Sequence, residues 1–254
     1  MATPTIPAPA QQAPAPVSSV GRVFNVFFEP KKTFESIVQR PTWVLPMLIV
    51  IVLGLVAVAT IGSRIGWRQV IDHQIASSPR AQQRMEQIPA AQRESILEKQ
   101  AKFAGVFGYV GAVVGTVVAE IIVAALLLAA FKIISGSQIG FSTSLGIVAH
   151  SWMPYVISGI LGIVILFIKD PSTIDVQNIV ASNPGALLPD NSAKWLVSLL
   201  TSLDIFTFWA IILQAIGFRA TNPKKVSFGQ ALGIIVALWL VFVFLKVGFA
   251  AAFA

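Results

Sequence analysis

The chain has 254 residues, of which 56% are hydrophobic and only 11% are charged, and its formal net charge is +7. Soluble domains carry about 25% charged residues, so this apolar surplus excludes an ordinary water-soluble domain and predicts that lipid is the solvent. Cysteine is absent, which excludes disulfides, thiolate metal sites and cysteine nucleophiles.

The basic excess fits the positively charged flanks of membrane helices, as the positive-inside rule produces. Nucleic-acid binding would instead need a soluble basic domain or a recognition motif, and we find neither in the sequence. We therefore expect a lipid bilayer as a partner and no nucleic acid.

Residues 1–18 form a stretch rich in proline and alanine, and the first seventeen carry no charged side chain. Such a composition cannot bury a core, so it predicts a disordered tail. Residues 19–254 are predicted to form one membrane domain.

Residues 18–40 predict two short amphipathic helices, the second of which starts at Pro30. Such helices ahead of a span suggest an element that lies in the headgroup region. An alternative is that they pack on the cytoplasmic ends of the bundle itself, and both readings stay open. The residues expected to carry this interfacial role are Phe24, Phe27, Phe28, Lys31, Lys32 and Phe34.

Five long apolar segments follow, each long enough to cross a hydrocarbon core, which takes about 20 residues. They predict an all-α polytopic integral membrane protein, a bundle of five transmembrane helices with N-terminal amphipathic helices. The expected spans are 43–61, 105–131, 141–168, 196–218 and 228–251.

The loops refine this arrangement. The stretch "AAQRESILEKQAKF" after Pro89 predicts a helix that runs straight into the second span. The third loop is rich in Pro, Asn and Ser, and its irregular backbone cannot face lipid, so we expect it outside the membrane. Basic residues around the N-terminus and between the last two spans favour a cytoplasmic N-terminus in the cell membrane, although the first loop is also basic.

Four ionisable residues fall inside the predicted spans, namely Glu120, His150, Asp204 and Lys246. With a rise of about 1.5 Å per residue, Glu120 and His150 reach similar depths on one side of the midplane. Asp204 and Lys246 lie toward the other side. The depths therefore suggest two interhelical pairs, Glu120 with His150 and Asp204 with Lys246.

Ionisable residues at membrane depth are candidates for function, and three roles are open for them. They can join helices through structural hydrogen bonds, with Glu120 as a protonated strut. They can form a proton or ion route, or they can contact a lipid or a partner.

Small residues on two spans predict close helix packing. Gly108, Gly111 and Gly115 form a strip with a GxxxG on the second span, and Ser158 and Gly162 offer a partner strip on the third. We expect this contact inside the monomer rather than at a dimer face. Pro154 is expected to kink the third span next to His150.

Three stretches together carry a resemblance: "FFEPKKTFESIVQRPTWVLPML", "SLGIVAHSWMPYVISGIL", and "SLDIFTFWAIILQAIGF" followed by "SFGQALGIIVALWLV". Over residues 21–249 the sequence resembles the Yip family of five-span membrane proteins, in its bacterial form. The resemblance implies a cytoplasmic N-terminus, five helices and no known catalytic residue. Eukaryotic members act in membrane traffic with Rab GTPases, but where they tend to carry Asp-Leu-Tyr-Gly-Pro this chain has "RPTWVLP".

The common nucleotide-binding, hydrolase and metalloprotease motifs are missing from the sequence. The only histidines are His73 in a loop and His150 in a span, so we expect no metal site, no cofactor and no enzymatic activity. The favoured function is a membrane scaffold or adaptor that organises membrane or recruits protein partners through its N-terminal region. The alternative is a small secondary transporter or channel that uses Glu120, His150 and Asp204.

Overall fold

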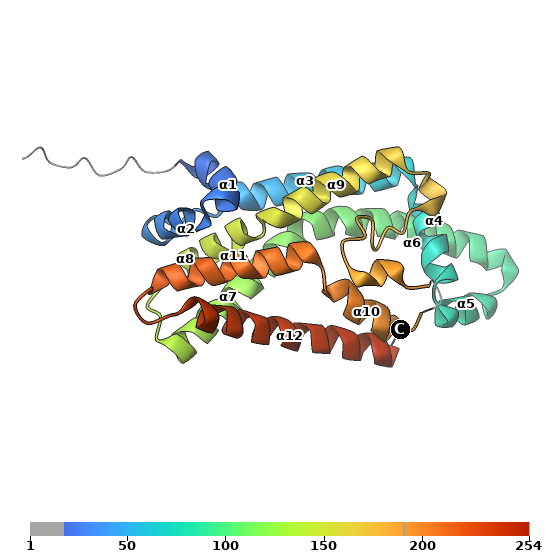
Figure 1. The fold of residues 1–254 in the computed structure, drawn as a ribbon. Helices are drawn as coiled ribbons and strands as arrows, with labels where there is room; N and C mark the ends of the chain where they lie inside the picture. Colours follow the sequence, from blue (N-terminus) through green and yellow to red (C-terminus); the bar gives the residue numbers. More distant parts are fainter. Residues whose placement is uncertain (1–17, 190–191, 254) are drawn as a thin grey trace, which may run out of the picture.

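The computed structural model describes residues 18–189 and 192–253, so the predicted tail at 1–18 lies almost wholly outside the described residues. The described residues form helices joined by turns and loops, without a strand. The helices lie roughly along one axis and make an elongated bundle (Figure 1). This arrangement confirms the predicted all-α class.

Four helical segments are long and apolar enough to cross a membrane, and a bent helix pair brings the total to as many as five. The bent pair is α10 and α11, whose axes differ by 47°. The five-span prediction therefore holds when this pair is counted as one span. The spans are α3 (Val44–Arg64), α6 (Ala90–Val110) with the π-helix η1 (Gly111–Gly115) and α7 (Thr116–Ser135), α8 (Phe141–Ser151) with α9 (Met153–Ile168), α10 (Lys194–Ser202) with α11 (Ile205–Thr221), and α12 (Phe228–Phe253).

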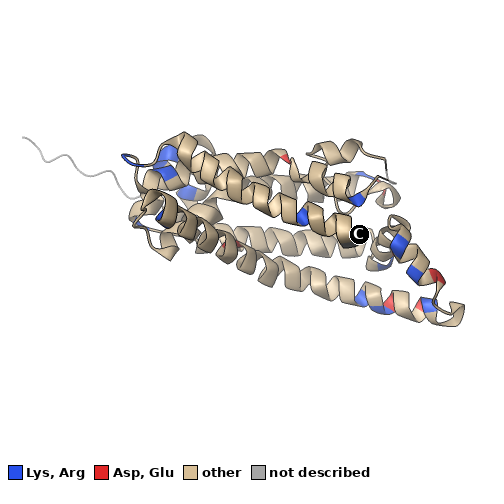
Figure 2. Ribbon diagram, turned by 90° about the horizontal axis from the view of Figure 1, so that it is seen from below, with Lys and Arg blue, Asp and Glu red and all other residues tan. Residues whose placement is uncertain are grey.

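The second span begins well outside the apolar band, as the first loop predicts. It is helical without a sharp bend from Ala90 to Ser135, over 46 residues, whereas about 20 suffice to cross the hydrocarbon core. The helices α4 (Trp67–Ala76) and α5 (Pro79–Glu86) fold back beside its protruding first half. Figure 2 shows Lys and Arg gathered at both ends of the bundle, with few charged residues between them.

The helix α8 is surrounded by other parts of the bundle. Every residue from Thr143 to Ser151 is buried, so α8 is covered on all faces rather than along one stripe. Small residues permit this close packing. The Ser144 hydroxyl donates to the Ala124 carbonyl of α7 at 2.7 Å, and a Cβ on Gly146 would lie 3.1 Å from both Ile37 and the Thr42 carbonyl.

Two short helices, α1 (Ser19–Phe28) and α2 (Pro30–Gln39), lie against one end of the bundle (Figure 1). Ser18 caps α1 by accepting a hydrogen bond from Gly21 N at 3.0 Å. Pro30 occupies the first turn of α2, as predicted, because its missing N–H has no intrahelical partner there. Fully buried Val26, Phe34 and Ile37 join these helices to the main core.

The third loop folds onto the opposite part of the bundle instead of extending away from it. Ile174 packs with Leu166 and Ile65, while η2 (Pro171–Thr173) and η3 (Pro184–Leu187) shape the chain around them. Ser182 O accepts a hydrogen bond from Ile205 N at 3.2 Å. Irregular backbone of this kind is compatible with a membrane protein where it is covered by protein.

Candidate functional site

Glu120 lies in the core stripe of α7. The residues that follow it on this stripe are Ala124, Leu127 and Phe131, all of them buried. The Glu120 side chain itself is fully buried, and neither carboxyl oxygen has a hydrogen-bond partner among the described residues. Because an ionised carboxylate without a partner is strongly disfavoured at this depth, the arrangement favours a neutral side chain.

His150 sits near the end of α8, where Pro154 disrupts the helical ladder. The helix stops at Ser151 and resumes at Met153, with Trp152 between them. This interruption is where we expected the kink, because proline lacks the N–H that the carbonyl four residues earlier would accept. The His150 ring is fully buried, its Nδ1 donates to the Gly146 carbonyl at 2.8 Å, and its Nε2 has no partner among the described residues.

The structure does not bring Glu120 and His150 into hydrogen-bonding contact, although the sequence spacing predicted similar depths for them. The contact between Ser144 and Ala124 fixes the facing sides of α8 and α7. Glu120 precedes Ala124 by four residues and so keeps nearly the same direction. His150 follows Ser144 by six residues, and at about 100° per residue its side chain points about 120° away from that of Ser144.

The fourth span is interrupted at Asp204, which serves as the N-cap of α11. Its Oδ1 accepts hydrogen bonds from the backbone N–H of Phe206 at 2.9 Å and of Thr207 at 3.1 Å. Its Oδ2 accepts a short hydrogen bond from the Ser182 hydroxyl in the third loop. A carboxylate in this position satisfies free N–H groups and complements the positive end of the helix dipole.

Lys246 of α12 reaches the other side of the same break. Its Nζ donates to the Ser202 hydroxyl at 3.1 Å, and that hydroxyl donates to the Ser198 carbonyl at 2.7 Å. The cation therefore lies at the C-terminal, negative end of α10. Lys246 and Asp204, which were predicted to pair, are not in direct contact in the described part of the chain. Asp204 complements the start of α11, whereas Lys246 complements the end of α10.

An open cavity of about 380 Å³ adjoins this break and is lined mainly by the third loop, α9, α10 and α11; we call it the helix-break cavity. Asp204, Tyr155 and Thr207 line it, and the Tyr155 hydroxyl donates to Thr207 Oγ1 at 3.2 Å. The reciprocal amide pair Asn178 and Asn183 forms another polar part of the wall. Such a lining is suited to water or to a small hydrated cation.

The residues described by the structure contain no cluster of three or more His, Cys, Asp or Glu that could hold a metal ion. With Asp204 as its one acidic lining residue in the described ranges, the helix-break cavity lacks such a ligand set.

The predicted small-residue strips have different neighbours from those expected. A Cβ on Gly108 would lie 3.2 Å from Trp67 and Val58, whereas one on Gly111 or Gly115 would meet nothing within 4 Å. The physical reason is η1, because a π-helical turn bonds i to i+5 and moves later residues off the expected face.

The partner strip on the third span also has other neighbours. A Cβ on Gly162 would lie 3.5 Å from Val180 of the third loop, and Ser158 lines the helix-break cavity. The third span instead packs on the first, where a Cβ on Gly159 would approach Leu53 to 2.6 Å. The two predicted strips therefore do not meet.

The faces of the two N-terminal helices, α1 and α2, differ in how deeply their side chains are buried. Phe34 is fully buried against Gly217, and Phe27 is half-buried with its ring 5.5 Å from that of Trp209. Lys31 and Lys32 are exposed.

Phe24 and Phe28 are 62% and 82% exposed and, with Val20, form one apolar stripe on α1. Packing on the bundle therefore accounts for α2 and for one face of α1, and leaves the stripe uncovered.

Sequence reasoning missed Arg22, the residue that holds these helices together. Its Nη1 donates to the Arg40 carbonyl at 2.7 Å and to Thr42 Oγ1 at 2.9 Å, and its Nη2 donates to the Ser36 carbonyl at 3.2 Å. Only 4% of the residue is exposed, and this burial, together with the nearby Arg40 charge, lowers the pKa of Arg22. The available signal was a lone charge on an otherwise apolar helix.

The fold and these buried polar groups define a polytopic, all-helical integral membrane protein. The model of the Yip1 domain matches residues 24–249, and the chain belongs to this family. This result confirms the resemblance carried by the three sequence stretches. No curated protein and no solved structure matched the chain.

Proposed function

We propose that this integral membrane protein is a non-enzymatic scaffold or adaptor of the cell membrane that organises membrane or recruits protein partners through its N-terminal helices. The observation that supports this role is the exposed stripe of Val20, Phe24 and Phe28 on a helix that is otherwise fixed to the bundle. The stripe lies outside the predicted spans, so the lipid tails around the bundle do not account for it.

The fixed position of α1 makes the stripe suitable for recognition. Arg22 and the buried Val23 and Val26 hold one side of the helix, so the opposite side keeps a constant orientation. Rigid presentation reduces the ordering entropy lost on binding. Exposed Lys31 on the adjacent helix adds positive charge, which suits the anionic cytoplasmic leaflet, whereas the charge of exposed Lys32 is paired with Glu29 at 2.9 Å.

Photocrosslinking in native membranes tests this proposal. A photoreactive phenylalanine analogue replaces Phe24 or Phe28, and the same analogue at buried Phe34 is the matched control. We expect lipid or foreign protein to be crosslinked from positions 24 and 28, and only this chain from position 34. Crosslinks confined to this chain at all three positions would contradict the proposal.

We further propose that the N-terminus is cytoplasmic. The absence of cysteine allows clean single-site labelling. In intact cells, a membrane-impermeant thiol reagent is expected to label Ser77→Cys in the first loop but not Ser19→Cys in α1. The reverse labelling pattern would invert the topology.

One observation favours a transporter or channel as a second candidate, namely the broken helix with Asp204 beside the helix-break cavity. Discontinuous helices of this kind form ion sites in transporters. The double variant Glu120→Gln with Asp204→Asn discriminates the two functions in reconstituted vesicles. A transporter should lose ion flux while still folded, whereas a scaffold should show no flux difference.

A further inference from the structure

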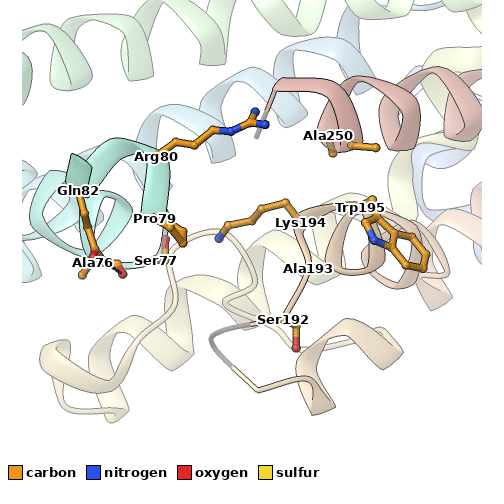
Figure 3. Close-up of a pocket in the computed structure, with 11 residues that line it drawn as sticks. Ala76, Ser77, Pro79, Arg80, Gln82, Ser192, Ala193, Lys194, Trp195 and Ala250 are labelled. Carbon is orange, nitrogen blue, oxygen red and sulfur yellow. Dashed lines mark hydrogen bonds between the residues drawn. The ribbon is translucent and has the colours of Figure 1, made fainter. Parts of the chain in front are cut away.

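A second cavity, of about 590 Å³, lies at the end of the bundle far from α1, between the turn that joins α4 to α5 and the ends of α10 and α12 (Figure 3). We call it the loop-end cavity. Its walls include Arg80, Lys194, Ser77, Pro79, Trp195 and Ala250. The proposed scaffold role makes no use of it.

The described lining of the loop-end cavity carries positive charge without a carboxylate. Figure 3 shows the side chains of Arg80 and Lys194 both extending into the space between α5 and the ends of α10 and α12. Arg80 Nη1 donates to the Ala252 carbonyl at 3.2 Å, which leaves its other guanidinium N–H groups available. Lys194 Nζ has no hydrogen-bond or ion-pair partner in the described ranges.

Two helices also begin at the walls of this cavity. The helix α5 starts at Pro79 and α10 starts at Lys194, so the positive ends of both dipoles add to the two side-chain charges. Ala193, the N-cap of α10, has no side chain that can accept from the first N–H groups. At the start of α10, backbone N–H groups are therefore open to an anion beside Lys194. At α5, by contrast, Pro79 has no N–H and Ser78 already caps the helix.

The depth of the cavity indicates the kind of anion. Ala250 and Ala251, near the end of the spanning helix α12, line it, and this places it where the hydrocarbon core gives way to headgroups. Trp195 is 45% exposed beside it, and tryptophan is typical of the membrane interface. Alanine and proline in the wall provide an apolar surface for the glycerol and upper acyl carbons of a lipid.

We propose that the loop-end cavity binds the headgroup of an anionic phospholipid, with its phosphate between Arg80 and Lys194. Basic pockets between membrane helices on the cytoplasmic side recognise anionic headgroups in this way. With a cytoplasmic N-terminus, this cavity presents the same chemistry to the outer leaflet. Free inorganic phosphate carries negative charge as well, but it has no apolar part that could contact the apolar wall. It also gains nothing from a site at the membrane interface.

Native mass spectrometry of the full-length protein released from nanodiscs tests the proposal. Nanodiscs of phosphatidylcholine alone are compared with nanodiscs that also contain phosphatidylglycerol. We expect retained phosphatidylglycerol, and a loss of binding of roughly fivefold for each cation removed. The variants are Arg80→Gln and Lys194→Gln. Arg84→Gln, on the same helix as Arg80 but outside the lining, is the matched control and should bind like the unmodified chain.

Lys194→Gln is the decisive variant, because it removes charge without breaking a described hydrogen bond. Folding is checked by the thermal unfolding of each variant in detergent. Equal retention of phosphatidylglycerol by the unmodified chain and Lys194→Gln would overturn the proposal. Retention of inorganic phosphate in lipid-free detergent, with the same loss in the variants and no preference for phosphatidylglycerol, would overturn a lipid as the source.

Discussion

The two ends of this bundle are stabilised in different ways. At the N-terminal end, formed by α1, α2, α8 and the last turns of α11, side chains such as Phe34, Ile147 and Phe218 are fully buried. At the loop end, formed by α4, α5, the first half of α6 and the start of α10, α5 has no buried residue and α6 has only Gly105. One end resembles a large protein core, whereas the other has a smaller buried cluster around Ile65, Val70 and Leu166.

This difference shows where each kind of function can be placed. A close-packed region transmits strain and presents a surface in a constant orientation, which suits the stripe on α1. A loosely packed region contains cavities and opens locally at low free energy, which suits the entry of a lipid into the loop-end cavity. The contrast leads to four predictions, from the largest expected effect to the smallest.

Replacing Arg22 tests the N-terminal end most severely. Arg22→Ala leaves two backbone carbonyls and Thr42 without their charged donor, and hydrogen bonds to charged groups contribute about 1.5–3 kcal/mol. We expect the free energy of unfolding in detergent to fall by about 3 kcal/mol and α1 to become accessible to protease. Arg40→Ala removes an exposed arginine nearby and should change little. Equal stability of the two variants would remove the basis for a fixed α1.

Gly217 tests whether the N-terminal end is as tightly packed as a core. A Cβ at this position would lie 2.4 Å from Ile147 and 2.9 Å from Phe34. We expect Gly217→Ala to lower the free energy of unfolding by about 2 kcal/mol through overpacking. Gly233→Ala in α12, where a Cβ would meet nothing within 4 Å, should stay within about 1 kcal/mol of the unmodified chain. Tolerance of both changes would mean that the N-terminal end is not packed as tightly as a core.

Hydropathy alone predicted the spans, since long apolar segments have no other stable environment, and the helix after Pro89 followed from its start signal. The break at Asp204 did not follow, because a capping carboxylate and a buried polar residue look alike in sequence. The side that each polar group faces was also hidden, since the π-turn at Gly111–Gly115 and the turn of His150 away from α7 depend on tertiary packing. The hydrogen-bond partners that the structure gives Asp204 and Lys246 therefore differ from the predicted pairing.

Asp204 lies between the two ends, and its replacement separates capping from ion binding. Asp204→Ala removes the acceptor for Phe206 N and Thr207 N, and the loss of an N-cap lowers stability by about 1 kcal/mol. Asp204→Asn keeps an acceptor of the same shape and should be nearly as stable as the unmodified chain. Thermal unfolding of both variants in one detergent makes the comparison. If Asp204→Asn is as damaging as Asp204→Ala, the negative charge has a role beyond capping.

The smallest effect is expected at the loop end, where an exposed network joins α4 to α6. Arg68 binds Glu94 through Nη1 at 2.5 Å and Nη2 at 3.1 Å, and binds Asp72 through Nε at 3.1 Å. These bonds lower the pKa of Glu94 and raise that of Arg68. A lowered carboxyl pKa stabilises the fold above the ordinary glutamate value of about 4.3, and this contribution is lost as the pH falls through the folded pKa.

Amide exchange of α4 measures this contribution, with protection corrected for the intrinsic effect of pH on exchange. We expect protection of α4 to decrease slightly in acid and in high salt, because exposed ion pairs are weak and screened. Glu94→Gln should reduce the acid-dependent loss of α4 protection, whereas Arg84→Gln should leave that loss unchanged. The N-terminal end is held mainly by burial and by Arg22, and its carboxylate contact in the described residues is the exposed pair Lys32–Glu29 at 2.9 Å. Protection of α2 should therefore change less than that of α4 over the same range. An equal acid response in α2 and α4 would mean that the two ends open together, against the contrast drawn from their packing.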